Sequence, residues 1–287
     1  MAVTRPHARA TLILQAGTSV QANYASEPRN GTTSGPELAR HLQEAAVGVQ
    51  VAPTLWIDGG IYASYIGLEG WTSADNPTYT RSFVAEFSPY YLSGLKATWQ
   101  ATSRISAQLH VTNGWQNISE DNRSKAIGTR IDVAVTPTTT LTYANFLGNE
   151  RPSGERGALR VFNQVMAKGT LPSGTEWQGQ IDVGAQQECR WYGAVVIARH
   201  PLSSRAALVG RVERYTDPDQ VIVATALADG FVANGASLGL DVALDGGVRW
   251  RSEVRAVRAS DELFPVGSGT QSTTLNRAVT TSLAFAF

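Results

Sequence analysis

Cysteine, long apolar runs and net charge are what this sequence has least of. Its single cysteine, Cys189, excludes an intramolecular disulfide and any cysteine-rich metal site. No stretch approaches the about 20 consecutive apolar residues that a membrane-spanning helix needs. Lys and Arg together number 24, as do Asp and Glu, so the formal net charge is zero. This balance gives no basic footprint for nucleic acid, and we expect no nucleic-acid partner.

Glycine and aromatic residues are abundant, and side-chain polarity alternates with period two. The 287 residues include 27 glycines, 7 tryptophans and 9 tyrosines, a composition that favours strands over helices. In 176–186, acidic and amide side chains alternate with residues such as Trp177 and Ile181. In 248–256, charged residues alternate in the same way with residues such as Val254. Alternation of this kind is typical of a strand whose two faces meet different surroundings.

Turn signals divide the chain into about 14 predicted strands, with 12 to 16 possible because 81–91 and 220–231 also contain strand-like runs. The predicted strands are 10–24, 38–52, 54–63, 91–101, 104–115, 125–136, 138–147, 157–168, 175–186, 190–200, 203–216, 232–244, 247–258 and 274–287. An even count puts both termini at the same end. Tight turns alternate with longer polar connections, apart from one short connection near 187–189. A transmembrane barrel sorts its turns and loops in this way, whereas a soluble sandwich has no reason to do so.

The sequence therefore predicts an all-β fold, a transmembrane antiparallel up-and-down β-barrel formed by a single domain over 1–287 in a bacterial outer membrane. The last strand alternates and ends on Phe287. A terminal aromatic of this kind resembles the signal that the barrel assembly machinery recognises, although a last core strand is the alternative interpretation. The first residues run directly into a strand, so we expect that the export signal has been removed from this chain or that its start has been trimmed. Outer-membrane lipid and lipopolysaccharide are the expected partners of the barrel wall.

Several sequence blocks, most specific over 54–150, resemble one known family. They are Gly60-Ile61-Tyr62, Ile66-Gly67-Leu68-Glu69-Gly70-Trp71, Asp75-Asn76, Tyr79-Thr80-Arg81-Ser82, Phe87-Ser88-Pro89-Tyr90-Tyr91 with Gly94, Asn113-Gly114-Trp115-Gln116, Asn122 with Lys125, and Asn145-Phe146 with Gly148. In these blocks the chain resembles the OmpL-like porin family of Gram-negative bacteria, also called β-barrel porin-2. The resemblance implies an outer-membrane barrel with porin activity and brings no catalytic residues.

In such a barrel the outward side chains must be apolar, because a Lys or Arg that faces lipid at the bilayer midplane costs about 2–4 kcal/mol. The polar series of each strand must then face an aqueous lumen. The side chains predicted to line this pore are Lys96, Gln108, His110, Arg130, Asp132, Gln178, Gln180, Asp182, Arg211, Glu213, Asp241, Arg249, Arg251, Glu253 and Arg255. The arginines among them either pair with neighbouring carboxylates and stiffen the wall, or create a field that favours anions.

The connection 64–90 is the longest and is unusually rich in aromatic residues. We expect part of it to fold inward and narrow the pore, with a hydrophobic cap on the rim as the alternative. The charged residues of this candidate constriction loop are Glu69, Asp75, Arg81 and Glu86.

Nothing in the sequence predicts catalysis. The four histidines are isolated, with no spacing of a metal pair, and His110 has no serine partner that the sequence places beside it. We expect no cofactor, no metal and no enzyme activity. The predicted function is a porin or channel for passive diffusion of small hydrophilic solutes. The alternatives are a non-conducting structural or adhesive barrel and an outer-membrane barrel enzyme.

Overall fold

The computed structural model describes residues 2–15, 41–118, 122–151, 157–225, 227–267 and 271–285. Phe287, the predicted connection 25–37, the predicted strand residues 16–24 and the start of the predicted strand 38–52 lie outside these residues. None of the helices in the described ranges is both long enough and apolar enough to cross a membrane.

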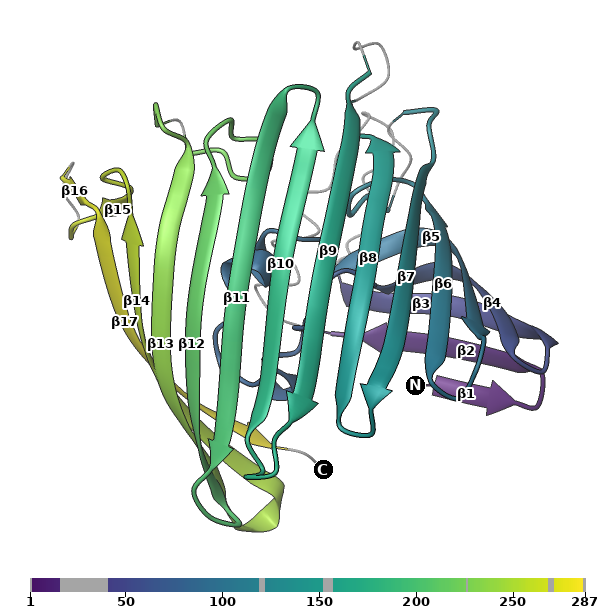
Figure 1. Ribbon diagram of the computed structural model, residues 1–287, viewed down its shortest axis with the longest axis horizontal. Helices are drawn as coiled ribbons and strands as arrows, with labels where there is room; N and C mark the ends of the chain where they lie inside the picture. Colours follow the sequence, from purple (N-terminus) through teal and green to yellow (C-terminus); the bar gives the residue numbers. More distant parts are fainter. Residues whose placement is uncertain are drawn as a thin grey trace. The chain divides into compact units, whose positions relative to one another are not determined.

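An antiparallel sheet of fifteen strands dominates the structure, and its strands pair in chain order from β1 to β14, followed by β17 (Figure 1). The strands are β1 (Ala2–Arg5), β2 (Ala8–Leu14), β3 (Leu42–Ala52), β4 (Leu55–Ala63), β5 (Tyr91–Gln100), β6 (Ile105–Thr112), β7 (Ala126–Thr136), β8 (Thr139–Asn149), β9 (Leu159–Thr170), β10 (Glu176–Gln186), β11 (Cys189–Pro201), β12 (Ala206–Asp217), β13 (Phe231–Ala243), β14 (Val248–Ala259) and β17 (Leu275–Phe285). A separate two-stranded ladder joins β15 (Phe264–Pro265) to β16 (Ser272–Thr273).

The fourteen predicted strands correspond to β2–β14 and β17, which confirms the all-β, up-and-down prediction. The additional strand is β1, which pairs with β2 through a turn at Pro6 and His7. The prediction placed the first strand at 10–24, whereas β2 begins at Ala8.

Among the described residues, the two further strand-like runs, 81–91 and 220–231, form no strand of their own and only reach the first residues of β5 and β13. Within 81–91 the chain forms the short helix α2 (Phe83–Glu86), because the Ser82 hydroxyl accepts a hydrogen bond from the Ala85 amide. Within 220–231 the carboxylate of Asp217 accepts hydrogen bonds from three successive amides, those of Val221, Ile222 and Val223. This holds the chain in a loop until β13 begins. Apolar residues alone therefore overestimated the strand content of both connections.

The chain divides into two compact units, each of which has its own packed side chains. The first contains Met1–Ile66, Pro89–Val133 and Thr142–Asn163, and the second contains Gly67–Ser88, Ala134–Leu141 and Gln164–Phe287. The expectation of a single domain over 1–287 stays a prediction.

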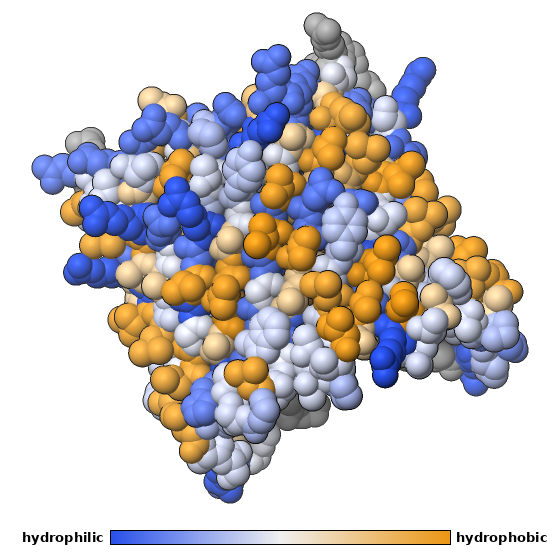
Figure 2. All heavy atoms as spheres, viewed as in Figure 1, coloured by the Kyte–Doolittle hydropathy of each residue, from blue (hydrophilic) through white to orange (hydrophobic). Residues whose placement is uncertain are grey.

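The two faces of the strands differ sharply in the second unit. Ile181, Val196 and Leu238 are exposed on one face, and hydrophobic side chains recur over the β10–β13 region of that face in Figure 2. On the other face of the same strands, Asp182 and Arg211 are buried. The alternation read from the sequence thus separates an apolar exposed face from a polar covered face.

One register position in the first unit requires glycine on both of its paired strands. Gly60 and Gly94 are register partners in β4 and β5, and both have positive φ angles, 134° and 155°. A Cβ on Gly60 would lie 2.2 Å from the carbonyl oxygen of Ala45, and one on Gly94 would lie 2.1 Å from that of Val111. Both positions therefore exclude any side chain.

We predict that Gly60→Ala lowers the free energy of unfolding by about 1–3 kcal/mol, through positive φ and backbone overlap. Gly210→Ala is the matched control. A Cβ on Gly210 meets no atom within 4 Å, so this substitution should leave the free energy of unfolding unchanged. Urea-unfolding midpoints in detergent measure both variants. Equal midpoints for the two would contradict the backbone argument.

Candidate functional site

Residues 67–88, here called the docked segment, lie on the polar face of the second unit and cover its charged side chains. The segment contains the short 3₁₀ helix η2 (Ser73–Asp75) and the helix α2, which packs against β11 and β12. Gly193 of β11 leaves room for this contact, because a Cβ there would lie 2.5 Å from a methyl carbon of Val84. The sequence expectation placed this connection inward, and the structure places it against the polar face.

Arg211 is the centre of the contact between β12 and the docked segment. It is 2% exposed, and its guanidinium donates to the Thr78 hydroxyl at 2.9 Å and to the carbonyl oxygen of Thr80. Its Nε lies 3.2 Å from a carboxylate oxygen of Glu213, and its Nη2 lies 3.2 Å from one of Glu253. Two carboxylates and the segment's own oxygens therefore replace the water that this cation loses on burial.

The same two carboxylates also hold the docked segment. Glu253 accepts hydrogen bonds from the Thr80 amide at 2.7 Å and the Thr80 hydroxyl at 2.8 Å. Glu213 accepts from the Phe83 amide at 2.6 Å and from Arg255 at 2.7 Å. Hydrogen bonds to charged groups are among the strongest in proteins, so these contacts fix the middle of the segment.

Arg251 performs the same role on β14. Its Nε donates to its register partner Asp241 at 2.8 Å. Its remaining nitrogens donate to the carbonyl oxygens of Ser73, Asn76 and Pro77 at 2.6, 2.8 and 2.6 Å. Because these acceptors are backbone carbonyl oxygens, Arg251 fixes the backbone position of the segment whatever side chains the segment has there.

Amide side chains anchor the start of the segment. Gln164 accepts from the Gly67 amide at 2.8 Å, and Gln180 accepts from the Leu68 amide at 3.2 Å. Both glutamines also donate to the buried Asp182, at 2.7 Å from Gln164. Gln180 and Asp182 were predicted from the alternation of 176–186, whereas Gln164, on β9, was not predicted.

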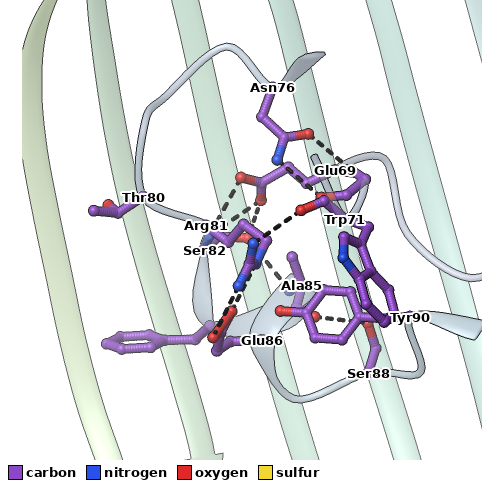
Figure 3. A network of polar contacts seen from close by, with 12 residues as sticks. Glu69, Trp71, Asn76, Thr80, Arg81, Ser82, Ala85, Glu86, Ser88 and Tyr90 are labelled. Atoms are coloured by element: carbon purple, nitrogen blue, oxygen red, sulfur yellow. Dashed lines mark hydrogen bonds and ion pairs between the residues drawn. The ribbon is translucent and has the colours of Figure 1, made fainter. Parts of the chain in front are cut away.

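Contacts within the segment stabilise its fold, and Figure 3 shows them from close by. Asn76 closes a loop by bonding both the amide and the carbonyl of Gly70, at 2.7 and 2.9 Å (Figure 3). Arg81 donates to Glu86 at 2.8 Å and to the Trp71 carbonyl at 3.1 Å. Hydrogen bonds between its own residues therefore stabilise the conformation of the docked segment.

Glu69 is a buried carboxylate within this network. It accepts hydrogen bonds from the amide and the hydroxyl of Ser82 (Figure 3). Burial raises the pKa of Glu69, a shift that the Ser82 hydrogen bond and the Arg211 charge oppose and that Glu213 reinforces. Among the predicted loop residues, Glu69 is therefore buried, whereas Asp75 and Glu86 are exposed and Arg81 is half-buried.

The first unit has a separate polar cluster around His110, which is fully buried. The His110 ring stacks on Tyr65 at a centroid distance of 3.9 Å, and its Nε2 lies 3.0 Å from Gln108. Arg130 pairs with Asp132 at 2.9 Å and donates to the Tyr65 carbonyl at 2.7 Å. These four predicted pore residues are therefore engaged with one another or with Tyr65.

Lys96 is the register partner of His110, and its ammonium nitrogen lies 4.9 Å from the Tyr62 ring centroid and 3.8 Å from a carboxylate oxygen of Asp58. Asp58 also receives two hydrogen bonds from Arg9, at 2.6 and 2.5 Å. Within the part of the chain that the structure describes, no group of three or more His, Cys, Asp or Glu side chains is arranged to hold a metal ion.

The remaining predicted residues differ in exposure. Arg249 is exposed and donates to the Ala74 carbonyl at 2.9 Å. Arg255 is half-buried, and its guanidinium carbon lies 5.0 Å from the centroid of the Phe83 ring, a cation–π contact. Gln178 is half-buried and lines a cavity beside Pro77. Since Arg211, Arg251 and Arg255 all have carboxylate partners, the geometry favours the wall-stiffening interpretation of the arginines over an unpaired cationic field.

We predict that Arg211→Gln lowers the free energy of unfolding by about 3–5 kcal/mol, because it leaves Glu213 and Glu253 buried without their shared cation. Arg205→Gln is the matched control, since Arg205 and its partner Asp245 are both exposed. Arg205→Gln should lower the free energy of unfolding by less than about 1 kcal/mol. Thermal unfolding in detergent measures both, and similar losses would contradict the role given to Arg211.

The raised pKa of Glu69 predicts a specific pH dependence of stability. A carboxyl whose pKa is raised by folding contributes stability below its unfolded pKa, and this contribution disappears as the pH rises through the folded pKa. The thermal midpoint of the protein should therefore fall over that interval relative to Glu69→Gln, in which the group stays neutral. Parallel pH profiles of the two proteins would contradict this prediction.

Comparison with known proteins agrees with this architecture. The family model described as "Putative beta-barrel porin-2, OmpL-like" matches residues 1–287. No curated protein sequence matches the chain significantly.

Solved structures show the same fold at low sequence identity. The anion-selective porin from Comamonas acidovorans matches with a TM-score of 0.60 and 10% identity, covering 87% of this chain and 80% of that one. OmpT, an outer membrane protein of Vibrio cholerae, gives 0.55 and 9%, covering 82% and 77%. OccK5 (OpdH) of Pseudomonas aeruginosa gives 0.50 and 11%, covering 85% and 70%. The fold is that of outer-membrane porin barrels, and the chain belongs to the OmpL-like β-barrel porin-2 family.

Proposed function

We propose that this protein is an outer-membrane channel for passive diffusion of small hydrophilic solutes. The observation that carries the proposal is the separation of faces: exposed aliphatic side chains on one face of β10–β14, and a polar face with charged side chains on the other. The first face suits hydrocarbon and the second suits water or a polar solute. Passage through such a channel needs no chemical step, so we assign no catalytic residue.

We further propose that the docked segment forms the constriction of this channel. Its contacts with Arg211, Arg251 and Glu253 hold it on the polar face, where it takes up space that solutes would otherwise use. A cavity of about 460 Å³ remains on the same face beside Pro77, at the end of the strands that carries the tight turns. The predicted partners are small hydrophilic solutes, outer-membrane lipid and lipopolysaccharide. Assembly through Phe287 also stays a prediction.

One observation favours a second candidate, a non-conducting structural barrel. Asp182, Arg211 and Arg251, which were predicted to line the pore, are each at most 2% exposed beneath the docked segment. A segment bound this firmly acts as a plug if it leaves no continuous path. The two candidates differ only in whether water passes the segment, so transport distinguishes them.

Liposome swelling tests the channel directly. Proteoliposomes should swell in small sugars, at rates that fall as the sugar size increases, because a fixed constriction sieves by size. Liposomes with heat-unfolded protein provide the control. Absence of swelling with the smallest sugar would support the structural barrel instead.

Deleting 72–80 tests the constriction. The deletion removes the carbonyl oxygens that bind Arg251 and the hydroxyls that bind Arg211, so the segment should leave the polar face and single-channel conductance should rise at least twofold. Arg205→Gln, which does not touch the segment, should conduct as the parent does. Conductance that does not change on deletion would assign the segment to a cap.

A further inference from the structure

The cavity beside Pro77 has a lining that is distinct from the network that holds the docked segment. Its walls come from the turn between β7 and β8, from the end of β9, the start of β10 and the end of β11. Thr140, Lys168 and Gln178 have the same strand parity as the buried polar residues of β8, β9 and β10, and Arg199 has that of the buried Val195 and Ile197 on β11. They therefore point to the polar face of the second unit.

The charged side chains of this cavity carry one excess positive charge. Arg199 Nη1 lies 3.7 Å from Glu176 Oε2, and Arg199 Nε lies 3.7 Å from Asp241 Oδ2. Both distances are longer than that of an ordinary hydrogen bond. Asp241 is already neutralised by Arg251 at 2.8 Å. Lys168 is exposed, and within the described part of the chain no hydrogen bond or ion pair engages its ammonium group. Lys168 and Arg199 together thus outnumber Glu176.

A second observation points to a ligand. The side-chain nitrogen of Gln178 is buried and has no hydrogen-bond partner among the described residues. A buried donor without a partner loses its hydrogen bonds to water and gains none in return, so such groups normally meet a partner. Thr140 also lines the cavity, and Pro77 and Ile197 add apolar side chains to its lining.

We propose that this cavity binds solutes that have one carboxylate on a short carbon body. The carboxylate accepts hydrogen bonds from Arg199, Lys168 and the Gln178 amide, which neutralises the excess charge and satisfies the orphaned donor. The carbon body lies against Ile197 and Pro77. The proposal rests on the proposed channel, because it names the class of solute that pauses on the polar face.

Calorimetric titration of the folded, full-length protein in detergent tests this binding without any transport. Butyrate should bind, and neutral butyramide, which has the same carbon skeleton, should bind at least tenfold more weakly. Lys168→Gln combined with Arg199→Gln should weaken butyrate binding at least tenfold. Arg104→Gln, at an exposed turn residue, is the matched control and should bind butyrate as the parent does.

Gln178→Leu separates hydrogen bonding from charge, because it removes the amide donor and changes no charge. It should weaken butyrate binding about threefold or more, with the circular dichroism spectrum unchanged. Equal binding of butyrate and butyramide, or no loss in the double variant, would overturn the proposal. Inorganic phosphate that binds as tightly as butyrate would also overturn it, since the site would then recognise anions without preference for carboxylates.

The outcome is distinguishable from that of the channel proposal. Butyrate binding without sugar-driven swelling supports this site and contradicts the channel. Swelling without butyrate binding supports the channel and contradicts this site.

Discussion

Burial of Arg211 between two carboxylates is the interaction on which the rest of the structure depends. A guanidinium removed from water needs both charge compensation and hydrogen-bond acceptors, and Glu213 and Glu253 supply the first. The acceptors come from Thr78 and Thr80 of the docked segment. The polar face therefore cannot be covered by an arbitrary loop. It selects a segment that offers oxygen atoms at the positions that its arginines reach, and Arg251 repeats this logic with three backbone carbonyls.

This arrangement divides the polar face of the second unit into two parts. Where the docked segment lies, charges are paired and buried, and they act structurally. Beyond Pro77, Lys168 and Arg199 are held loosely and the cavity remains open to a solute. The same type of residue thus has two roles on one face, and the difference is whether the protein or a solute supplies the partner. Exposed aliphatic side chains on the opposite face suit lipid and leave both roles undisturbed.

The strands were predictable because alternation is a local property of the sequence. Residues such as Leu238 and Asp241 have opposite polarity at odd spacing, and their strand assignment follows without tertiary information. The length and aromatic residues of 64–90 singled out this connection in the sequence, and its inward path stays a prediction. The bonds that hold this connection were not predictable, because Thr80 and Glu253 are 173 residues apart and meet only through the fold. The short helix α2 and the Asp217 loop were missed because a single side chain that binds backbone amides overrides an apolar run. The sequence of β9 places Lys168 on the same face as Arg160 and Gln164, whereas β11 has apolar residues on both faces, so alternation does not assign Arg199 to the polar face.

Reagent accessibility measures the separation of faces most directly. Spin labels on single cysteines introduced at Ile181 or Val254, and at Lys168 or Arg199, would be examined in lipid vesicles with Cys189 replaced by serine. Labels at Ile181 and Val254 should be relaxed by oxygen, which concentrates in hydrocarbon, and little by a water-soluble nickel chelate. Labels at Lys168 and Arg199 should show the reverse preference. If the nickel chelate relaxed both pairs equally, the assignment of one face to lipid and the other to water would be contradicted.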